Sequence, residues 1–163
     1  MKEFKQFIKE AQDSKRDRVK TAREYTEPIV KGVLEKHGYD ITKSTPDEDF
    51  KGIDLKAYNK KTKKTTLIDV KCSKPENQGS NNFLYTTMTV DGKSYEDKLT
   101  EYVAFLNFPR NELVLIEFNE IKKLIKDCRQ IPSKHGGQGK YVLIPKDVVR
   151  EHGYKIIDKE LIK

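Results

Sequence analysis

Two apolar runs, Gly52-Ile-Asp-Leu-Lys-Ala-Tyr58 and Thr65-Thr-Leu-Ile-Asp-Val-Lys-Cys72, flank a short lysine-rich segment. Their β-branched content and the polar segment between them predict the two strands of a β-hairpin. If its turn is centred on residues 61 and 62, the antiparallel register places Asp54 directly opposite Asp69. Like charges that face each other across two strands destabilise a sheet. The two aspartates therefore need an explanation beyond strand formation.

A divalent cation supplies one explanation for the acidic pair. Two carboxylates beside the ammonium of Lys71 make a hard-oxygen site for a cation such as Mg²⁺. The alternative is a structural ion pair, because an acid two residues before a lysine recurs in a chain with 36% charged residues. Asp69-Val-Lys71 differs from the other copies in its nearly continuous apolar setting, which predicts a strand buried on both faces. A buried Asp and Lys that only neutralise each other gain little over apolar residues, which favours a functional site.

These motifs resemble those of the PD-(D/E)XK nuclease superfamily, which includes restriction enzymes, Holliday-junction resolvases, and phage and homing endonucleases. Gly52-Ile-Asp54 matches the first acidic motif, with Ile in place of the more usual Pro. Asp69-Val-Lys71 matches the second motif, with Asp in place of the more frequent Glu. Upstream, Arg23 to Tyr39 is similar to the resolvase-type helix that ends in Gly plus an aromatic residue, and Glu27 matches its metal-binding acid.

The resemblance implies an α/β fold with a restriction-endonuclease-like core, a central mixed β-sheet flanked by helices in the order αβββαβ. It implies an endonuclease that hydrolyses DNA phosphodiester bonds with Mg²⁺, for which Mn²⁺ would substitute. Asp54, Asp69, Glu27 and the carbonyl of Val70 would hold the metal, and Lys71 would orient water or stabilise negative charge. The alternatives are a non-catalytic nucleic-acid-binding module on the same fold, and an RNA-directed or exonucleolytic relative. Cutting both strands requires two active sites, so we expect a homodimer or a higher oligomer.

Composition agrees with a nucleic-acid partner. The 163 residues predict a single domain, and 33 Lys and Arg against 26 Asp and Glu give a net charge of +7, which favours a polyanion. No apolar run approaches the roughly 20 residues of a membrane helix. The two cysteines lack metal-ligand spacing and the lysine-rich start lacks a signal-peptide core, so we expect a soluble, cytoplasmic protein. Residues 1–20 form a charged arm that either contacts DNA or is only solvated.

Several lysines and polar residues are candidates for nucleic-acid contacts. The hairpin tip either clamps phosphate or keeps the turn soluble, and the polarity of the other loops explains their residues equally well. The acidic segment 44–49 is predicted to be a solvated loop, with Asp49 as a secondary metal candidate. The candidates are Lys60, Lys61, Lys63 and Lys64 at the tip, Ser73, Lys74 and Gln78 in the next loop, and Lys134 in a glycine-rich loop.

The remaining patterns predict the other elements. A helix over 20–37 should break near Pro28, with Thr26 as a fresh N-cap, and a strand should follow over 39–43. Residues 83–90 and the Asp91-Gly92 turn predict an inserted β-hairpin, which limits the next helix to 94–100. Strands are predicted over 101–108, 112–118 and 141–145, and helices over 119–128, capped by Asn119, and over 146–151.

Overall fold

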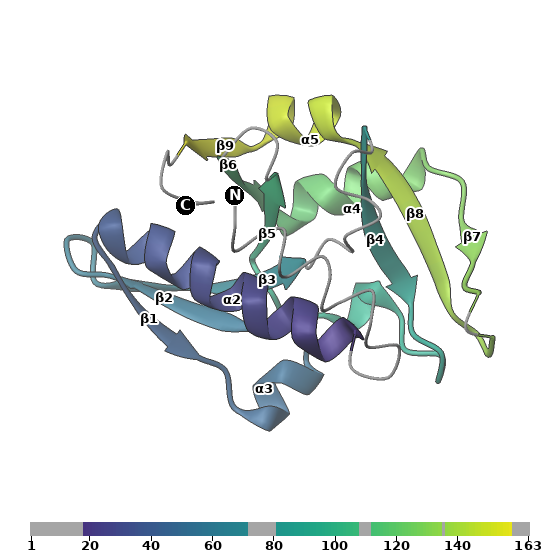
Figure 1. Cartoon of the computed structure of the whole chain (residues 1–163), viewed down its shortest axis with the longest axis horizontal. Helices are drawn as coiled ribbons and strands as arrows, with labels where there is room; N and C mark the ends of the chain where they lie inside the picture. The colour runs from purple at the N-terminus through teal and green to yellow at the C-terminus, as the bar shows by residue number, and fades with distance from the viewer. Residues whose placement is uncertain (1–17, 72–80, 108–111, 135, 158–163) are drawn as a thin grey trace.

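The computed structural model describes residues 18–71, 81–107, 112–134 and 136–157, so nearly all of the predicted arm lies outside the described residues. A six-stranded sheet forms the centre of the fold, in the order β1-β2-β3-β5-β6-β9 (Figure 1). Among the described strands of this sheet, only β3 and β5 pair in parallel. The predicted α/β class with a central mixed sheet is therefore confirmed. The strands are β1 (Tyr39–Lys43), β2 (Leu55–Asn59), β3 (Lys64–Lys71), β5 (Tyr102–Asn107), β6 (Glu112–Glu117) and β9 (Tyr154–Ile157).

The predicted hairpin is confirmed in its register. Leu55 pairs with Ile68 and Asn59 with Lys64, so the turn lies between β2 and β3 as expected. Asp54 directly precedes β2, and its N–H donates to the carbonyl of Ile68 at 2.9 Å. The pairing therefore continues past the end of β2 and brings Asp54 beside Asp69.

The helix α2 (Arg18–Lys36) covers one face of the central sheet, over β1, β2 and β3 (Figure 1). The predicted break at Thr26 and Pro28 is wrong, because α2 continues through Pro28 and Thr26 is buried within it. Burial of the apolar stripe stabilises α2 by more than the proline costs. The predicted C-terminal stop is observed, with Gly38 at a φ of +90° just beyond the last turn. The stripe is buried through Val30, Val33 and Leu34.

Alternation along β3 sends its side chains to two different cores. Ile68 and Val70 pack in the cluster beneath α2. Asp69 and Lys71 pair with Val103 and Phe105 of β5, which pack in the cluster on the opposite face. The acidic residue and the lysine therefore share the face that α2 does not cover.

A second sheet of three strands, in the order β4-β8-β7, packs on that opposite face. It contains β4 (Asn82–Met88), β8 (Lys140–Pro145) and β7 (Ile131–Pro132). The prediction that β4 pairs with the segment after the Asp91-Gly92 turn is wrong. Its partner is β8, and a single bridge between Met88 and Ser94 joins it to the segment after the turn. The apolar face of β8 offers β4 a longer buried partner than residues 94–100 do. Those residues form a 3₁₀ turn, η2 (Tyr95–Asp97), in place of the predicted helix.

The segment predicted as an acidic loop contains a short helix, α3 (Pro46–Phe50). Thr45 and Glu48 form a capping box, in which each side chain accepts a hydrogen bond from the other residue's backbone N–H. The Thr-Pro-Asp-Glu order carried this signal, and Pro46 suits the first helical position. The composition of the segment is equally typical of a turn, which is why the prediction failed.

Two further helices and the last strand complete the fold. The predicted cap at Asn119 is wrong, since α4 (Phe118–Lys126) begins one residue earlier and Glu117 precedes it without a side-chain cap. The helix α5 (Lys146–His152) matches its prediction, and β9 follows it where no strand was predicted. Among the helices in the described ranges, none combines the length and apolar character needed to cross a bilayer.

Candidate functional site

A pocket of about 350 Å³ opens between the hairpin and the second sheet. Three parts of the chain line it: the end of α3 with the loop to Asp54, the end of β3, and the segment from β4 through η2 to Lys98. The pocket therefore lies on the face of β3 that carries Asp69 and Lys71. Residues from each part converge there although they are far apart in sequence.

Asp54 and Asp69 form a buried carboxylate pair in this pocket. They are 9% and 4% exposed, and their side chains hydrogen-bond to each other. The N–H of Val70 donates to Asp54 Oδ2 at 2.7 Å, which orients the carboxyl group. The two carboxyl groups are close enough for each to shift the pKa of the other.

The pKa values of the two aspartates move in opposite directions. Burial, together with the negative charge of Asp69, raises the pKa of Asp54 from 3.8 to about 8. Burial alone would also raise the pKa of Asp69, but the ammonium groups of Lys71 and Lys98 more than offset it and leave this pKa below its usual value. Near neutral pH, Asp54 is therefore the protonated partner and Asp69 the charged one.

Two lysines bind the same oxygen of Asp69. Lys71 Nζ lies 3.0 Å and Lys98 Nζ 2.9 Å from Asp69 Oδ2, and both ammonium groups lie over the ring of Tyr85, at 4.6 and 5.2 Å from its centroid. Burial and the positive charge of Lys71 lower the pKa of Lys98 to about 8. Burial also disfavours the charged form of Lys71, yet the Asp69 carboxylate keeps its pKa above the usual value. Lys98 was not predicted to lie at this site, because no local sequence pattern links it to β3.

Gly52 explains how Lys98 reaches the site. Its φ is +86°, and a Cβ built at this position would lie 2.6 Å from Cγ of Lys98. The N–H of Leu99 also donates to the carbonyl of Lys51 at 2.9 Å, which ties the two segments together. The glycine in the first acidic motif therefore allows the backbone of one segment to pack closely against the lysine stem of the other.

Of the two other acidic candidates, Asp49 lines the pocket and Glu27 does not. Glu27 is buried on α2, with its carboxylate 3.9 Å from Lys43 Nζ, and is not among the residues that line the pocket. Asp49 lines the pocket and hydrogen-bonds to the side chain of Asp54. Within the described ranges, no group of three His, Cys, Asp or Glu side chains is arranged to share a metal ion. The structure thus brings together Asp54, Asp69 and Lys71, and leaves Glu27 apart from them.

The predicted nucleic-acid contacts lie elsewhere. The lysines of the hairpin tip are exposed at the end of β2 remote from Asp54, and Lys60 pairs with Asp40 at 3.3 Å. Lys134 is exposed in the loop between β7 and β8. Ser73, Lys74 and Gln78 lie outside the described residues.

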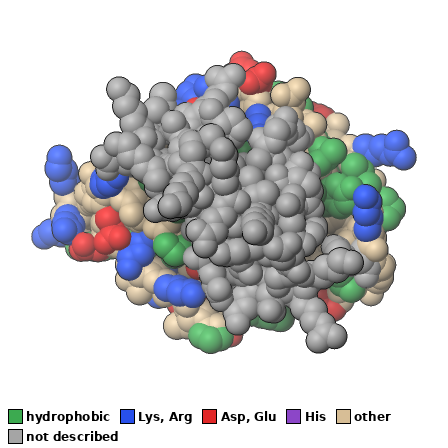
Figure 2. Space-filling view, in the orientation of Figure 1, with side chains coloured by type: hydrophobic (Ala, Val, Ile, Leu, Met, Phe, Trp, Pro, Cys, Tyr) green, Lys and Arg blue, Asp and Glu red, His purple; other side chains and the backbone are tan. Residues whose placement is uncertain are grey.

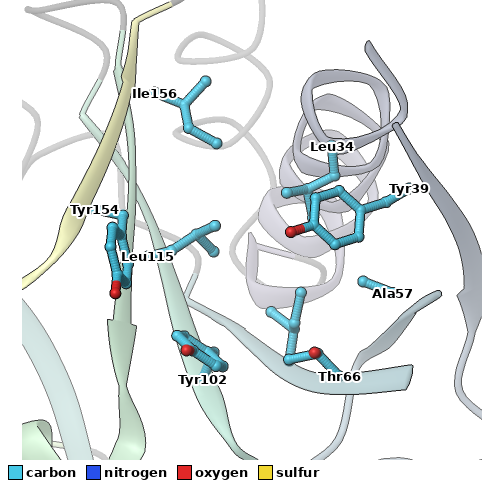
Figure 3. A pocket seen from close by; sticks show the side chains of 9 residues that line it. Leu34, Tyr39, Ala57, Thr66, Tyr102, Leu115, Tyr154 and Ile156 are labelled. Atoms are coloured by element: carbon cyan, nitrogen blue, oxygen red, sulfur yellow. The ribbon is translucent and has the colours of Figure 1, made fainter. Parts of the chain in front are cut away.

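A second cavity, of about 330 Å³, lies on the face of the sheet that carries α2. Figure 3 shows Leu34 and Tyr39 on one side of it and Tyr102, Leu115 and Tyr154 on the other. Among the described residues that line this cavity, none carries a carboxylate or an ammonium group. Its lining is therefore unsuited to the acid, base or metal chemistry that the first pocket offers.

Comparisons with known proteins add no assignment to this geometry. No protein-family model matches the chain, and no curated protein or solved structure matches it either. The chemistry of the pocket must therefore be judged from its own donors.

The pocket offers a divalent cation of the hard-oxygen type two carboxylates as ligands. Asp54, just before β2, and Asp69, on β3, supply carboxylate oxygens, and the pKa of Asp54 is raised by its burial and by the negative charge of Asp69. A cation there would displace the proton of Asp54 and pair with both carboxylates. The set amounts to two protein carboxylates, with Asp49 next to them.

Proposed function

We propose that this protein is a metal-dependent endonuclease that hydrolyses DNA phosphodiester bonds on a restriction-endonuclease-like core. The observation that carries the proposal is the buried Asp54–Asp69 pair, which lies in an open pocket with two lysines on one oxygen of Asp69. The order α2, β1, β2, β3 with a parallel strand β5 beside β3 supports the same core. The net charge of +7 favours a polyanionic substrate.

Five residues of the pocket have a role in this mechanism. Asp54, Asp69 and the carbonyl of Val70 would hold Mg²⁺, or Mn²⁺ in its place. When bound, the metal supplies a Lewis acid for the scissile phosphate and lowers the pKa of the attacking water. Lys71 orients that water or stabilises the negative charge that develops on the phosphate oxygens. Lys98 adds a second ammonium on the same side of the pocket.

A nucleic-acid-binding module without catalysis is the second candidate, and one observation favours it. Asp69 Oδ2 is bound by two ammonium groups, so the charge of this carboxylate is compensated within the chain. A phosphate backbone that met these lysines would bind without being cut. This candidate predicts affinity for DNA with a steep salt dependence and no cleavage.

Cleavage and metal binding should be measured separately. Supercoiled plasmid and branched oligonucleotides are incubated with Mg²⁺, with Mn²⁺ or with EDTA, and Tb³⁺ luminescence reports on the carboxylate pair without any substrate. We expect cleavage only with the metals, and loss of both cleavage and Tb³⁺ binding in Asp69→Asn. Lys71→Met should abolish cleavage but keep Tb³⁺ binding, because the carboxylates remain.

A matched control exists in Lys56, whose Nζ lies 3.0 Å from Glu48 Oε1 at similar partial burial but outside the pocket. Lys56→Met removes an ammonium group of similar exposure from a neighbouring ion pair and should leave cleavage unchanged. DNA binding by the wild type with no cleavage under any metal would favour the binding module instead.

A further inference from the structure

The rim of the pocket carries an unusually exposed aromatic residue. Phe50, the last residue of α3, lines the pocket and is 67% exposed. Hydrophobic surface is visible at the edge of the molecule where α3 lies (Figure 2). Single exposed apolar side chains are common on protein surfaces, so exposure alone decides nothing. The position of Phe50 beside the carboxylate pair is what gives it meaning.

A lysine from the opposite rim lies over this ring. Lys93 Nζ is 3.6 Å from the centroid of Phe50, although the two residues belong to different segments. The turn that carries Lys93 is well bonded: the N–H of Lys93 donates to Thr89 Oγ1 at 2.8 Å, and the N–H of Thr89 to the carbonyl of Lys93 at 2.9 Å. The aromatic ring and the ammonium therefore form a positioned pair across the mouth of the pocket.

Two other exposed apolar residues belong to the segments that carry Phe50's neighbours, although they do not line the pocket. Leu99 is 58% exposed and is tied by its N–H to Lys51, the residue after Phe50. Val90 is 51% exposed and belongs to the same turn as Lys93. An exposed aromatic ring with an ammonium group beside it suits a nucleobase that is attached to a phosphate, because the base stacks and the phosphate pairs with the cation.

We propose that Phe50 and Lys93 form a stacking site for an unpaired nucleobase next to the phosphodiester bond in the pocket. This inference rests on the proposed function and names its substrate class. Bases within a matched duplex are stacked on both faces by their neighbours, so only an unpaired base can stack on Phe50. The preferred substrate is then DNA with a single-stranded, mismatched or branched position beside the cleaved bond.

The test measures base stacking without cleavage. A single-stranded oligonucleotide with 2-aminopurine, and a matched duplex, are titrated with the full chain in Ca²⁺, with fluorescence for stacking and anisotropy for affinity. We expect quenching in single-stranded DNA and about tenfold weaker binding of that DNA by Phe50→Ala. Phe50→Trp should keep the affinity, and binding of matched duplex should not change.

Tyr154 provides the matched control, because it is 66% exposed but lines the other cavity. Tyr154→Ala should leave both affinities unchanged. An abasic nucleotide at the stacked position should weaken wild-type binding as much as Phe50→Ala does. The abasic nucleotide and Phe50→Ala together should reduce the affinity no further than either change alone. Equal affinity of Phe50→Ala and wild type for single-stranded DNA would overturn the stacking site, as would an equal loss on duplex DNA.

Cleavage assays with Mg²⁺ separate this inference from the proposed function. If no substrate is cut while quenching still depends on Phe50, the stacking site stands and the nuclease proposal fails. If matched duplex is cut as fast as mismatched DNA and Phe50→Ala changes neither rate, the nuclease stands and the stacking site fails.

Discussion

Asp54 is the residue on which the electrostatics of the pocket depend. Its position just before β2 buries it, and its neighbour across the hairpin carries a negative charge. The folded chain therefore favours the protonated form of Asp54, with a pKa of about 8. Asp69 is the opposite case, because two lysines stabilise its charged form. Protonation of Asp54 therefore leaves one negative charge in the buried pair, on Asp69, where Lys71 and Lys98 balance it.

This proton makes stability depend on pH in the metal-free protein. Since folding raises the pKa of Asp54, its stabilising contribution is full below its ordinary pKa of 3.8 and is lost as the pH rises towards 8. Asp54→Asn, which stays neutral, should gain free energy of unfolding relative to the wild type between pH 5 and 8, by on the order of 2–4 kcal/mol. Urea denaturation in EDTA measures this difference, with the exposed Asp40→Asn as control. Parallel pH profiles for wild type and Asp54→Asn would contradict it.

Gly52 should tolerate substitution less well than Gly38. Both have positive φ, +86° and +90°, so alanine strains the backbone at each by about 1 kcal/mol. Only at Gly52 does the new Cβ meet a neighbour, the stem of Lys98, whereas Gly38 has nothing within 4 Å. Gly52→Ala should therefore cost a further 1–3 kcal/mol or so of unfolding free energy. Urea denaturation compares the two variants, and Lys98→Ala should reduce the difference between them because it shortens that stem.

At the scale of elements, α5 is joined to the sheet by a buried polar network. Glu112 on β6 is 1% exposed and accepts hydrogen bonds from Arg150 Nε at 2.6 Å and from Asn107 Nδ2 at 2.9 Å. The network joins side chains from β5, β6 and α5. Val149, also on α5, is buried in the core cluster that the second sheet covers. Removing one partner leaves a buried charge without compensation, which costs more than the pair itself contributes.

Arg150→Met should therefore destabilise the protein by about 3–5 kcal/mol. Glu112→Gln in the Arg150→Met background should recover part of that loss, since the neutral amide needs no counter-charge. The exposed Asp147, 3.8 Å from Arg150 Nη1, is the control, and Asp147→Asn should cost less than about 1 kcal/mol. Thermal and urea unfolding give the values. A double variant less stable than Arg150→Met alone would show that the buried charge is not the cause.

At the scale of the whole molecule, the net charge of +7 predicts affinity for a polyanion without saying where the polyanion lies. The hairpin tip and α4 offer two comparable sets of lysines. The tip exposes Lys61, Lys63 and Lys64. The helix α4, which packs in the core cluster on the face that α2 does not cover, carries Lys122, Lys123 and Lys126. Equal charge can therefore be removed from either place.

If the tip clamps phosphate, its triple Lys→Gln variant should reduce the slope of log affinity against log salt by up to about 2.7, or about 0.9 per lost phosphate contact. The triple Lys→Gln variant of α4 should change the slope much less. Fluorescence anisotropy with duplex DNA over a range of salt concentrations, in the Asp69→Asn background, measures both. Equal changes in the two variants would mean that only net charge matters, and an unchanged slope at the tip would leave its lysines a role in solubility alone.

Local sequence patterns predict the features that depend on neighbouring residues. The hairpin, its register and the pairing of Asp54 with Asp69 followed from alternation and turn chemistry over about twenty residues. The apolar stripe of α2, the strand β1 and the core strands β5 and β6 followed from periodicity in the same way. Local patterns encode which face of an element is apolar, and that is sufficient for these predictions.

Long-range packing sets which distant segments of the chain meet. It gave β4 the partner β8, carried α2 through Pro28, and brought Lys98 and Phe50 to the carboxylate pair. None of these contacts has a local sequence signature, because each depends on how two cores pack on opposite faces of one sheet. The free energy of that packing exceeds the local preferences that a single stretch of sequence expresses.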